Sequence, residues 1–171
     1  MLVKEKKDIL IQAENKARYI LKDKGLIVPF KVYLEDKKDI LLAVPATYKS
    51  GSSAKGNIEI FIKSYLIGKK IDRILESILH EYSHAIYEEG YLINPNLGYE
   101  ITKLLSKYIN LSKNGQEAFH IPTLKDYELE KEYFCAWFAS YLMDVIPFGE
   151  NKDKIEDICR KIIQNFNQNH A

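Results

Sequence analysis

The sequence predicts one α+β domain, in which an N-terminal helix and a small, mostly antiparallel three-stranded sheet precede a helical part. Three observations predict this order. Apolar residues have helical spacing before Gly25, β-branched and aromatic runs fill residues 27–63, and helical spacing returns from Ile71 onward. The chain has 171 residues, which suits one domain with its own core, and no linker divides it. We therefore expect residues 1–171 to form a single domain.

The first helix is predicted over Lys4–Lys24, where apolar residues recur every three or four positions and Gly25 can end the helix. Three strands are expected next, at residues 27–34, 40–44 and 57–63. Ser50–Asn57, rich in Ser and Gly, is expected to be a loop. If the third strand lies at a sheet edge, it could pair with an extended peptide, although Lys55 and Lys63 could equally protect such an edge.

The rest of the chain is predicted to be helical. Apolar periodicity indicates helices over Ile71–Glu89, Gly98–Ile109, Asp126–Met143 and Lys152–Phe166. No internal repeat is present.

Composition excludes several classes of protein. With 25 basic against 24 acidic residues, the chain offers no sign of the basic face that direct nucleic-acid binding needs. Its two cysteines, Cys135 and Cys159, cannot build a disulfide framework. Since no apolar run approaches about 18 residues, no membrane span is predicted. The N-terminus is charged early and continues into an amphipathic pattern, so no secretory leader is predicted. The expected location is the cytoplasm.

One motif predicts a metal site: the H-E-x-x-H pattern of residues 80–84. On a helix, His80 and His84 lie one turn apart on one face, so that two imidazoles can meet one ion. Glu81 is the next residue after His80 on the helix, where its carboxylate can reach a water bound to this ion without itself binding the ion. Neutral imidazole suits zinc, whose catalytic sites have three protein ligands and an open position.

The alternative is two surface histidines on an ordinary amphipathic helix. At about 100° per residue, the apolar stripe of this helix is centred near Ile78, Tyr82 and Ala85. His80 and His84 lie on the side opposite to that centre. The helix could thus be anchored by one face and present both histidines on the other, as a metal site requires.

The third ligand has to come from elsewhere in the chain. A metzincin continuation would need Gly at position 87 and His at position 90, where Tyr87 and Gly90 stand. Glu132 is the preferred candidate, because its helical face also carries small apolar residues, among which a carboxylate is costly to bury without a cation or donor. Glu128, one turn earlier, is the second candidate. The alternative for Glu132 and Glu128 is that they bind no metal and simply form the solvent-exposed acidic first turn of the helix.

Two segments resemble the ImmA/IrrE-type zinc metallopeptidases, a gluzincin-like family. Residues 57–63 followed by 74–86 are similar to the strand and H-E-x-x-H helix of that family, and residues 132–143 are similar to its Glu-x-x-Ala-(Asn/Asp)-x-Phe-Ala helix. The resemblance implies a zincin-like fold, Zn²⁺ held by His80, His84 and Glu132, and Glu81 as catalytic acid and base. Cys135 and Ala136 depart from the family pattern.

The expected function is that of a zinc-dependent endopeptidase, which cleaves a specific protein partner such as a repressor or regulator. One alternative is a regulatory or binding module with a closed metal site, completed by a residue such as His120 or Cys135. Another is an exported effector or toxin peptidase. Catalysis is favoured because Glu81 has no role in a purely structural site. Packing is the preferred interpretation of Cys135, and His170, in a polar tail, is expected to have no role.

Overall fold

The computed structural model describes residues 3–35, 46–68, 70–93, 126–145 and 152–170. The described residues form an α+β fold with four α-helices, a mixed three-stranded sheet and two short 3-10 helices. The α-helices are α1 (Val3–Asp23), α2 (Ile71–Ile93), α5 (Asp126–Leu142) and α6 (Lys152–Gln168). The other elements are β1 (Phe30–Glu35), β2 (Ala46–Tyr48), β3 (Ile58–Lys63), η1 (Ser53–Lys55) and η2 (Ser64–Gly68).

Four predicted helices are confirmed, with ends that differ by a few residues. The helix predicted over Gly98–Ile109 and the strand predicted over residues 40–44 lie outside the described residues. β2 follows directly after that predicted strand. Within the expected Ser50–Asn57 loop, Ser53–Lys55 forms η1.

The sheet is mixed, and the prediction that it is mostly antiparallel is wrong. Its order is β1-β3-β2; β1 pairs with β3 in parallel over six positions, whereas β2 pairs with β3 antiparallel over three. β3 is the central strand, and Ile58, Ile60 and Ile62 are completely buried on one of its faces. A central strand has no free edge, so β3 does not offer the peptide-pairing edge considered from the sequence. Lys63 is itself buried.

The first helix ends as Gly25 predicts. Gly25 adopts a left-handed backbone with φ of +81°, and its N–H donates to the Lys22 carbonyl at 3.0 Å. The Leu26 N–H donates to the Leu21 carbonyl at 2.9 Å. These two bonds form a Schellman motif, which turns the chain from α1 toward β1.

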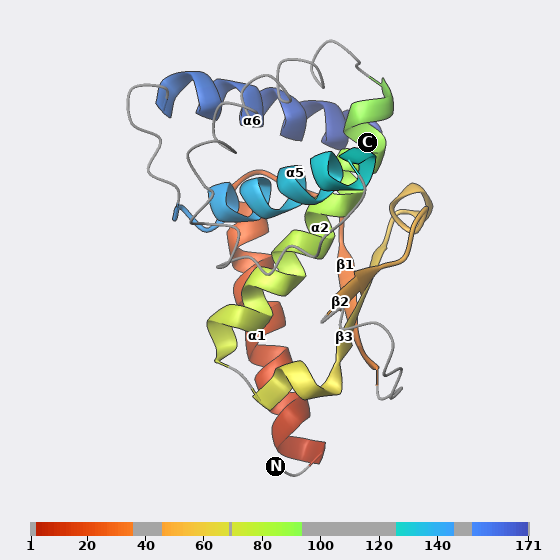
Figure 1. Cartoon of the computed structure of the whole chain (residues 1–171), viewed down its shortest axis with the longest axis vertical. Helices are drawn as coiled ribbons and strands as arrows, with labels where there is room; N and C mark the ends of the chain where they lie inside the picture. Colours follow the sequence, from red (N-terminus) through yellow and green to blue (C-terminus); the bar gives the residue numbers. More distant parts are fainter. Residues whose placement is uncertain (1–2, 36–45, 69, 94–125, 146–151, 171) are drawn as a thin grey trace.

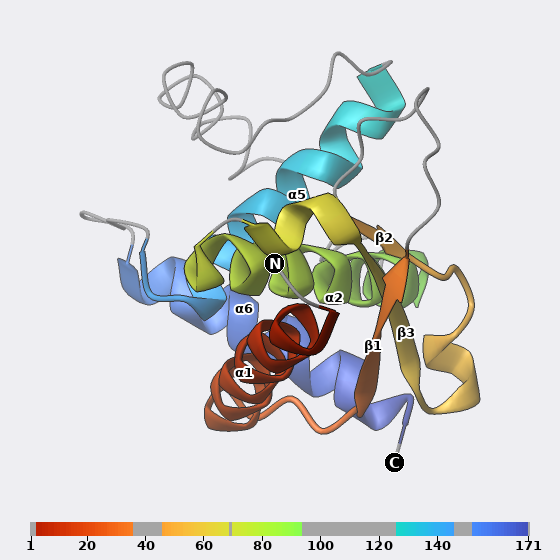
Figure 2. The same ribbon diagram turned by 90° about the horizontal axis from the view of Figure 1, so that it is seen from below.

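Helix α2 runs through the middle of the molecule, with α1 and the sheet packed on it and α5 crossing it (Figure 1). The view from below shows α1 beside the sheet and α5 on the other side of α2 (Figure 2). Tyr82 is completely buried in α2, where its hydroxyl donates to the Val28 carbonyl at 2.8 Å and its ring meets Phe30 and Phe166 edge-on. Helix α5 contacts α2 on the face that carries the histidines, so this face also has a neighbour.

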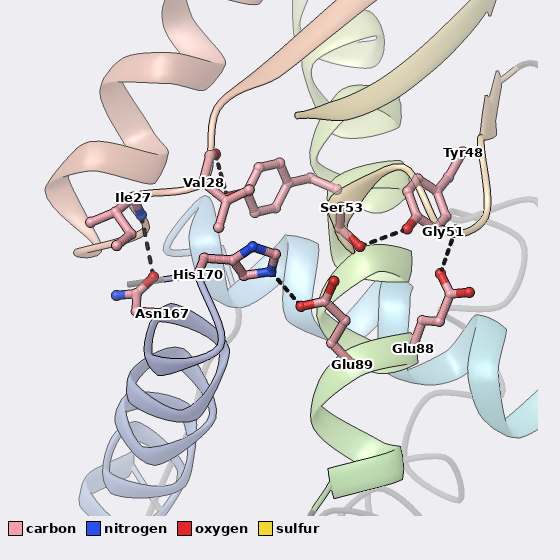
Figure 3. A network of polar contacts seen from close by, with 10 residues as sticks. Ile27, Val28, Tyr48, Gly51, Ser53, Glu88, Glu89, Asn167 and His170 are labelled. Atoms are coloured by element: carbon pink, nitrogen blue, oxygen red, sulfur yellow. Dashed lines mark hydrogen bonds and ion pairs between the residues drawn. The ribbon is translucent and has the colours of Figure 1, made fainter. Parts of the chain in front are cut away.

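The end of α6 packs against α2 and the turn after α1 (Figure 3). Asn167 donates from its side-chain amide to the Gly25 carbonyl at 2.7 Å. The His170 imidazole contacts the Glu89 carboxylate and lies against the Phe166 ring. The side chain of His170 is only 9% exposed, so this residue packs against α2 rather than lying in a solvated polar tail; that it has no role in the site stays a prediction.

None of the helices in the described part of the chain combines the length and apolarity that a membrane span requires.

Candidate metal centre

Helix α2 positions His80, Glu81 and His84 where α5 crosses it. The close approach of the two helices follows from small side chains on α5, since Cys135, Ala136 and Ala139 are all buried at the contact side. The larger Phe134 and Phe138 are buried among other aromatic rings, including Tyr87 and Tyr141. The division of α5 into a small-residue face and an aromatic face is therefore as the sequence predicts.

Glu132 of α5 lies between the two imidazoles. Its Oε2 is 2.8 Å from His80 Nε2, and its Oε1 is 3.1 Å from His84 Nε2. The two rings meet edge-on with centroids 5.1 Å apart. Zinc bonds to nitrogen and oxygen are about 2.0–2.2 Å long, so that neighbouring ligand atoms on a tetrahedral ion lie about 3.3 Å apart. Each imidazole nitrogen therefore lies about as far from a Glu132 oxygen as two ligand atoms of one zinc ion lie from each other.

The site is open on one side and closed on the other. The side chains of His80 and Glu132 are 20% and 22% exposed, whereas that of His84 is 9% exposed. Glu81 is buried and Cys135 is completely buried. Solvent therefore reaches the site from the side of His80 and Glu132, and Cys135 lies on the closed side.

The pKa values of Glu132, His80 and Glu81 are shifted by their surroundings. Burial opposes the charge of Glu132, but hydrogen bonds to both histidines outweigh it and hold the pKa of this carboxyl well below its usual range. Burial also opposes protonation of His80, yet the bond to Glu132 and nearby carboxylates raise the pKa of this imidazole. Burial raises the pKa of Glu81 despite the opposing histidine charges. A buried carboxyl with a raised pKa is suited to proton transfer near neutral pH.

Cys135 belongs to the same cluster. The ligand atoms of His80, His84 and Cys135 all lie within 4.8 Å of one another, which is close enough to bind a metal ion. Burial raises the pKa of the Cys135 thiol well above its usual range, with Glu132 and Glu81 adding to the effect. The thiol is thus protonated in the metal-free protein.

The structure brings together His80, Glu81, His84 and Glu132, the four residues selected from the sequence. The side chain of Glu128, the second ligand candidate, lies outside the described residues, as does His120. Sequence reasoning gave Cys135 a packing role and so missed its distance to the histidines. Its position three residues after Glu132, on the same helical face, was the available signal.

The donor set fits zinc. Two imidazole nitrogens and a carboxylate oxygen converge, and a thiol lies on the closed side; all three donor types are zinc ligands. In the metal-free protein, the carboxylate satisfies both rings, so that the ligands are held in place before an ion arrives.

Comparisons of this chain with protein-family models, with curated proteins and with solved structures find no match. The functional interpretation therefore depends on the geometry of these residues.

Proposed function

We propose that this chain is a zinc-dependent endopeptidase with a zincin-like fold, related to the ImmA/IrrE-type metallopeptidases, which hydrolyses a peptide bond in a specific protein partner. One observation carries the proposal: the Glu132 carboxylate lies 2.8 Å and 3.1 Å from the Nε2 atoms of His80 and His84. Two histidines one turn apart, with a glutamate from a second helix, form the ligand set of one class of catalytic zinc site.

Zinc held by His80, His84 and Glu132 would supply a Lewis acid that polarises the peptide carbonyl and activates water. Glu81 is the general base and acid. Its carboxylate takes a proton from the attacking water and returns it to the departing amine nitrogen. Burial raises the pKa of Glu81, which strengthens it as a base toward water and favours the protonated form needed in the second step.

A second candidate function is a non-catalytic regulatory or binding module with a closed metal site. The position of Cys135 favours it, because a fourth protein ligand would leave no place for water. The buried Glu81 beside the histidines favours catalysis, since a structural site does not need that carboxylate. An exported effector or toxin peptidase would share this chemistry and differ only in where it acts.

The test compares wild type with Glu81→Gln, a substitution that keeps the shape of the side chain and removes the base. Both proteins are expected to hold about one zinc per chain by elemental analysis. When each is produced in the native cell, new protein N-termini found by mass spectrometry should depend on wild type, and cleavage by the variant should fall by about 10²–10⁴-fold. Equal cleavage by both would rule out this role of Glu81, and no zinc in either after reconstitution would rule out the metal site.

A further inference from the structure

Cys135 is the metal-ligand candidate that the proposed mechanism does not use. Its sulfur lies within 4.8 Å of a ring nitrogen of both His80 and His84. It is three residues after Glu132 on α5, so that the thiol and carboxylate come from adjacent turns of one helix toward the same pair of rings. The chain therefore brings a fourth donor to a site whose mechanism requires only three.

Resting on the proposed zinc site, we propose that Cys135 is a fourth ligand, whose thiolate takes the coordination position that a catalytic water needs and holds the peptidase in a low-activity form. Zinc bonds to nitrogen and sulfur are about 2.1 Å and 2.3 Å long, so that two such donors on one tetrahedral ion lie about 3.6 Å apart. The ligand atoms of His80, His84 and Cys135 lie within 4.8 Å of one another, so a movement of about 1 Å or less brings the sulfur to that spacing.

The surroundings of Cys135 favour the bound thiolate once an ion is present. The side chain is completely buried beside the two histidines, and thiolate is a preferred ligand of zinc. Binding releases the proton of the thiol to solvent. The ion also offsets the negative charges of Glu132 and Glu81, which otherwise oppose thiolate formation.

The low activity follows from coordination number. Zinc with four protein ligands has the closed arrangement of structural sites, whereas a catalytic site keeps one position open. Glu81 is buried beside the same histidines and can act only when the sulfur is displaced. The presence of Glu81 and Cys135 at one site fits a peptidase whose activity is limited by sulfur coordination of its own metal ion.

The experiment uses the full chain loaded with Co²⁺ and, in parallel, with Zn²⁺. Wild type should show a near-ultraviolet thiolate-to-cobalt charge-transfer band, and zinc X-ray absorption should show one sulfur at about 2.3 Å among nitrogen and oxygen ligands at about 2.0–2.2 Å. Cys135→Ala should lose both signals and keep the ion on the remaining three ligands. Cys159→Ala is the matched control, because Cys159 is also buried but is not part of the cluster, and it should keep both signals.

The outcomes separate the two proposals. If neither ion binds, the proposed metal site fails, and the role of Cys135 fails with it. If an ion binds to wild type without a sulfur signal, the metal site stands and the fourth ligand is refuted, whether or not the Ala variant folds. A signal that survives Cys135→Ala and disappears in Cys159→Ala would also refute it. At equal zinc content, Cys135→Ala should cleave the partner faster than wild type; slower cleavage would overturn the inhibitory role.

Discussion

Glu132 of α5 contacts both histidines of α2 with one carboxylate, its Oε2 2.8 Å from His80 Nε2 and its Oε1 3.1 Å from His84 Nε2. His80 and Glu132 are 52 residues apart in the chain. The contact is possible because small side chains let α5 approach the histidine face of α2 closely. Each prediction below concerns this contact or a group that supports the helix beneath it.

Removing the Glu132 carboxylate should weaken metal binding. Glu132→Ala leaves His80, His84 and the buried Cys135 thiol, which must lose its proton to bind, so zinc per chain after dialysis against a chelator should fall clearly below the value of about one expected for wild type. Glu128→Ala is the matched control, since Glu128 is one turn earlier on the same helix, and it should keep the zinc. Elemental analysis of side-by-side preparations measures both. If Glu128→Ala loses its zinc and Glu132→Ala keeps it, the third ligand is Glu128 rather than Glu132.

The metal-free protein should be most stable at mildly acidic pH. The pKa of Glu132 is lowered, so its stabilising contribution is present above its unfolded pKa of about 4.5 and is lost as pH falls through the folded value. The pKa of His80 is raised, so its contribution is present below the unfolded pKa of about 6.5 and is lost as pH rises through the folded value. Burial raises the pKa of Glu81, so this residue, like His80, lowers the stability of the folded protein as the pH rises.

Melting temperatures measured with a chelator present, at a series of pH values, test whether the stability of the metal-free protein is greatest between about pH 4.5 and 6.5. Glu132→Gln should flatten the profile, because both contributions need the carboxylate. With zinc bound, stability should instead rise through pH 6.5, since the imidazoles must be neutral to bind the ion. A metal-free wild type whose melting temperature keeps rising to pH 8 would contradict the prediction.

Tyr82→Phe should destabilise the fold without affecting the metal. The substitution leaves the Val28 carbonyl without its 2.8 Å hydrogen bond in a buried place, which should lower the free energy of unfolding by about 1–3 kcal/mol. Zinc per chain should stay the same, because Tyr82 faces the core rather than the histidines. Tyr19→Phe, at a side chain that is 75% exposed, should change the unfolding free energy by no more than about 0.5 kcal/mol. Urea unfolding distinguishes the two variants.

Glu88 should hold the loop after β2 against α2. Its carboxylate accepts a hydrogen bond from the Ser50 hydroxyl at 2.5 Å. It also accepts one from the Gly51 N–H at 3.4 Å (Figure 3). Although burial acts the other way, these bonds lower the pKa of Glu88, so the anchorage should weaken only in acid. Glu88→Ala should speed hydrogen exchange over residues 49–56. Glu88→Gln keeps an acceptor and should show a smaller increase; equal exchange in wild type and both variants would rule out the anchor.

Local periodicity accounts for what could be predicted of the helices. Side chains three and four residues apart share a face, so the apolar stripe of α2 and the two faces of α5 could be assigned before any contact was known. The choice of Glu132 also followed, because a carboxylate on a face of small apolar residues needs a partner. Its distances to the two rings could not follow, since they depend on how the helices cross.

The sheet shows the limit of the same reasoning. Alternation in residues 58–63 predicts a strand and its buried face, but neighbours and direction depend on pairing between distant segments. Strands adjacent in sequence usually pair, which favoured an antiparallel sheet. Here β3 lies between β1 and β2, and its three isoleucines on one face are completely buried.

The sequence by itself determined the helices, the face on which His80 and His84 lie, and the carboxylate best suited to join them, because these depend on spacing within one helix. The tertiary structure alone decided the mixed sheet, the docking of His170 on Glu89, and the distance of Cys135 from the two histidines. Each of these is a relation between segments far apart in the chain. Such relations are set by how whole faces pack, and packing is a property of the assembled core rather than of any local pattern.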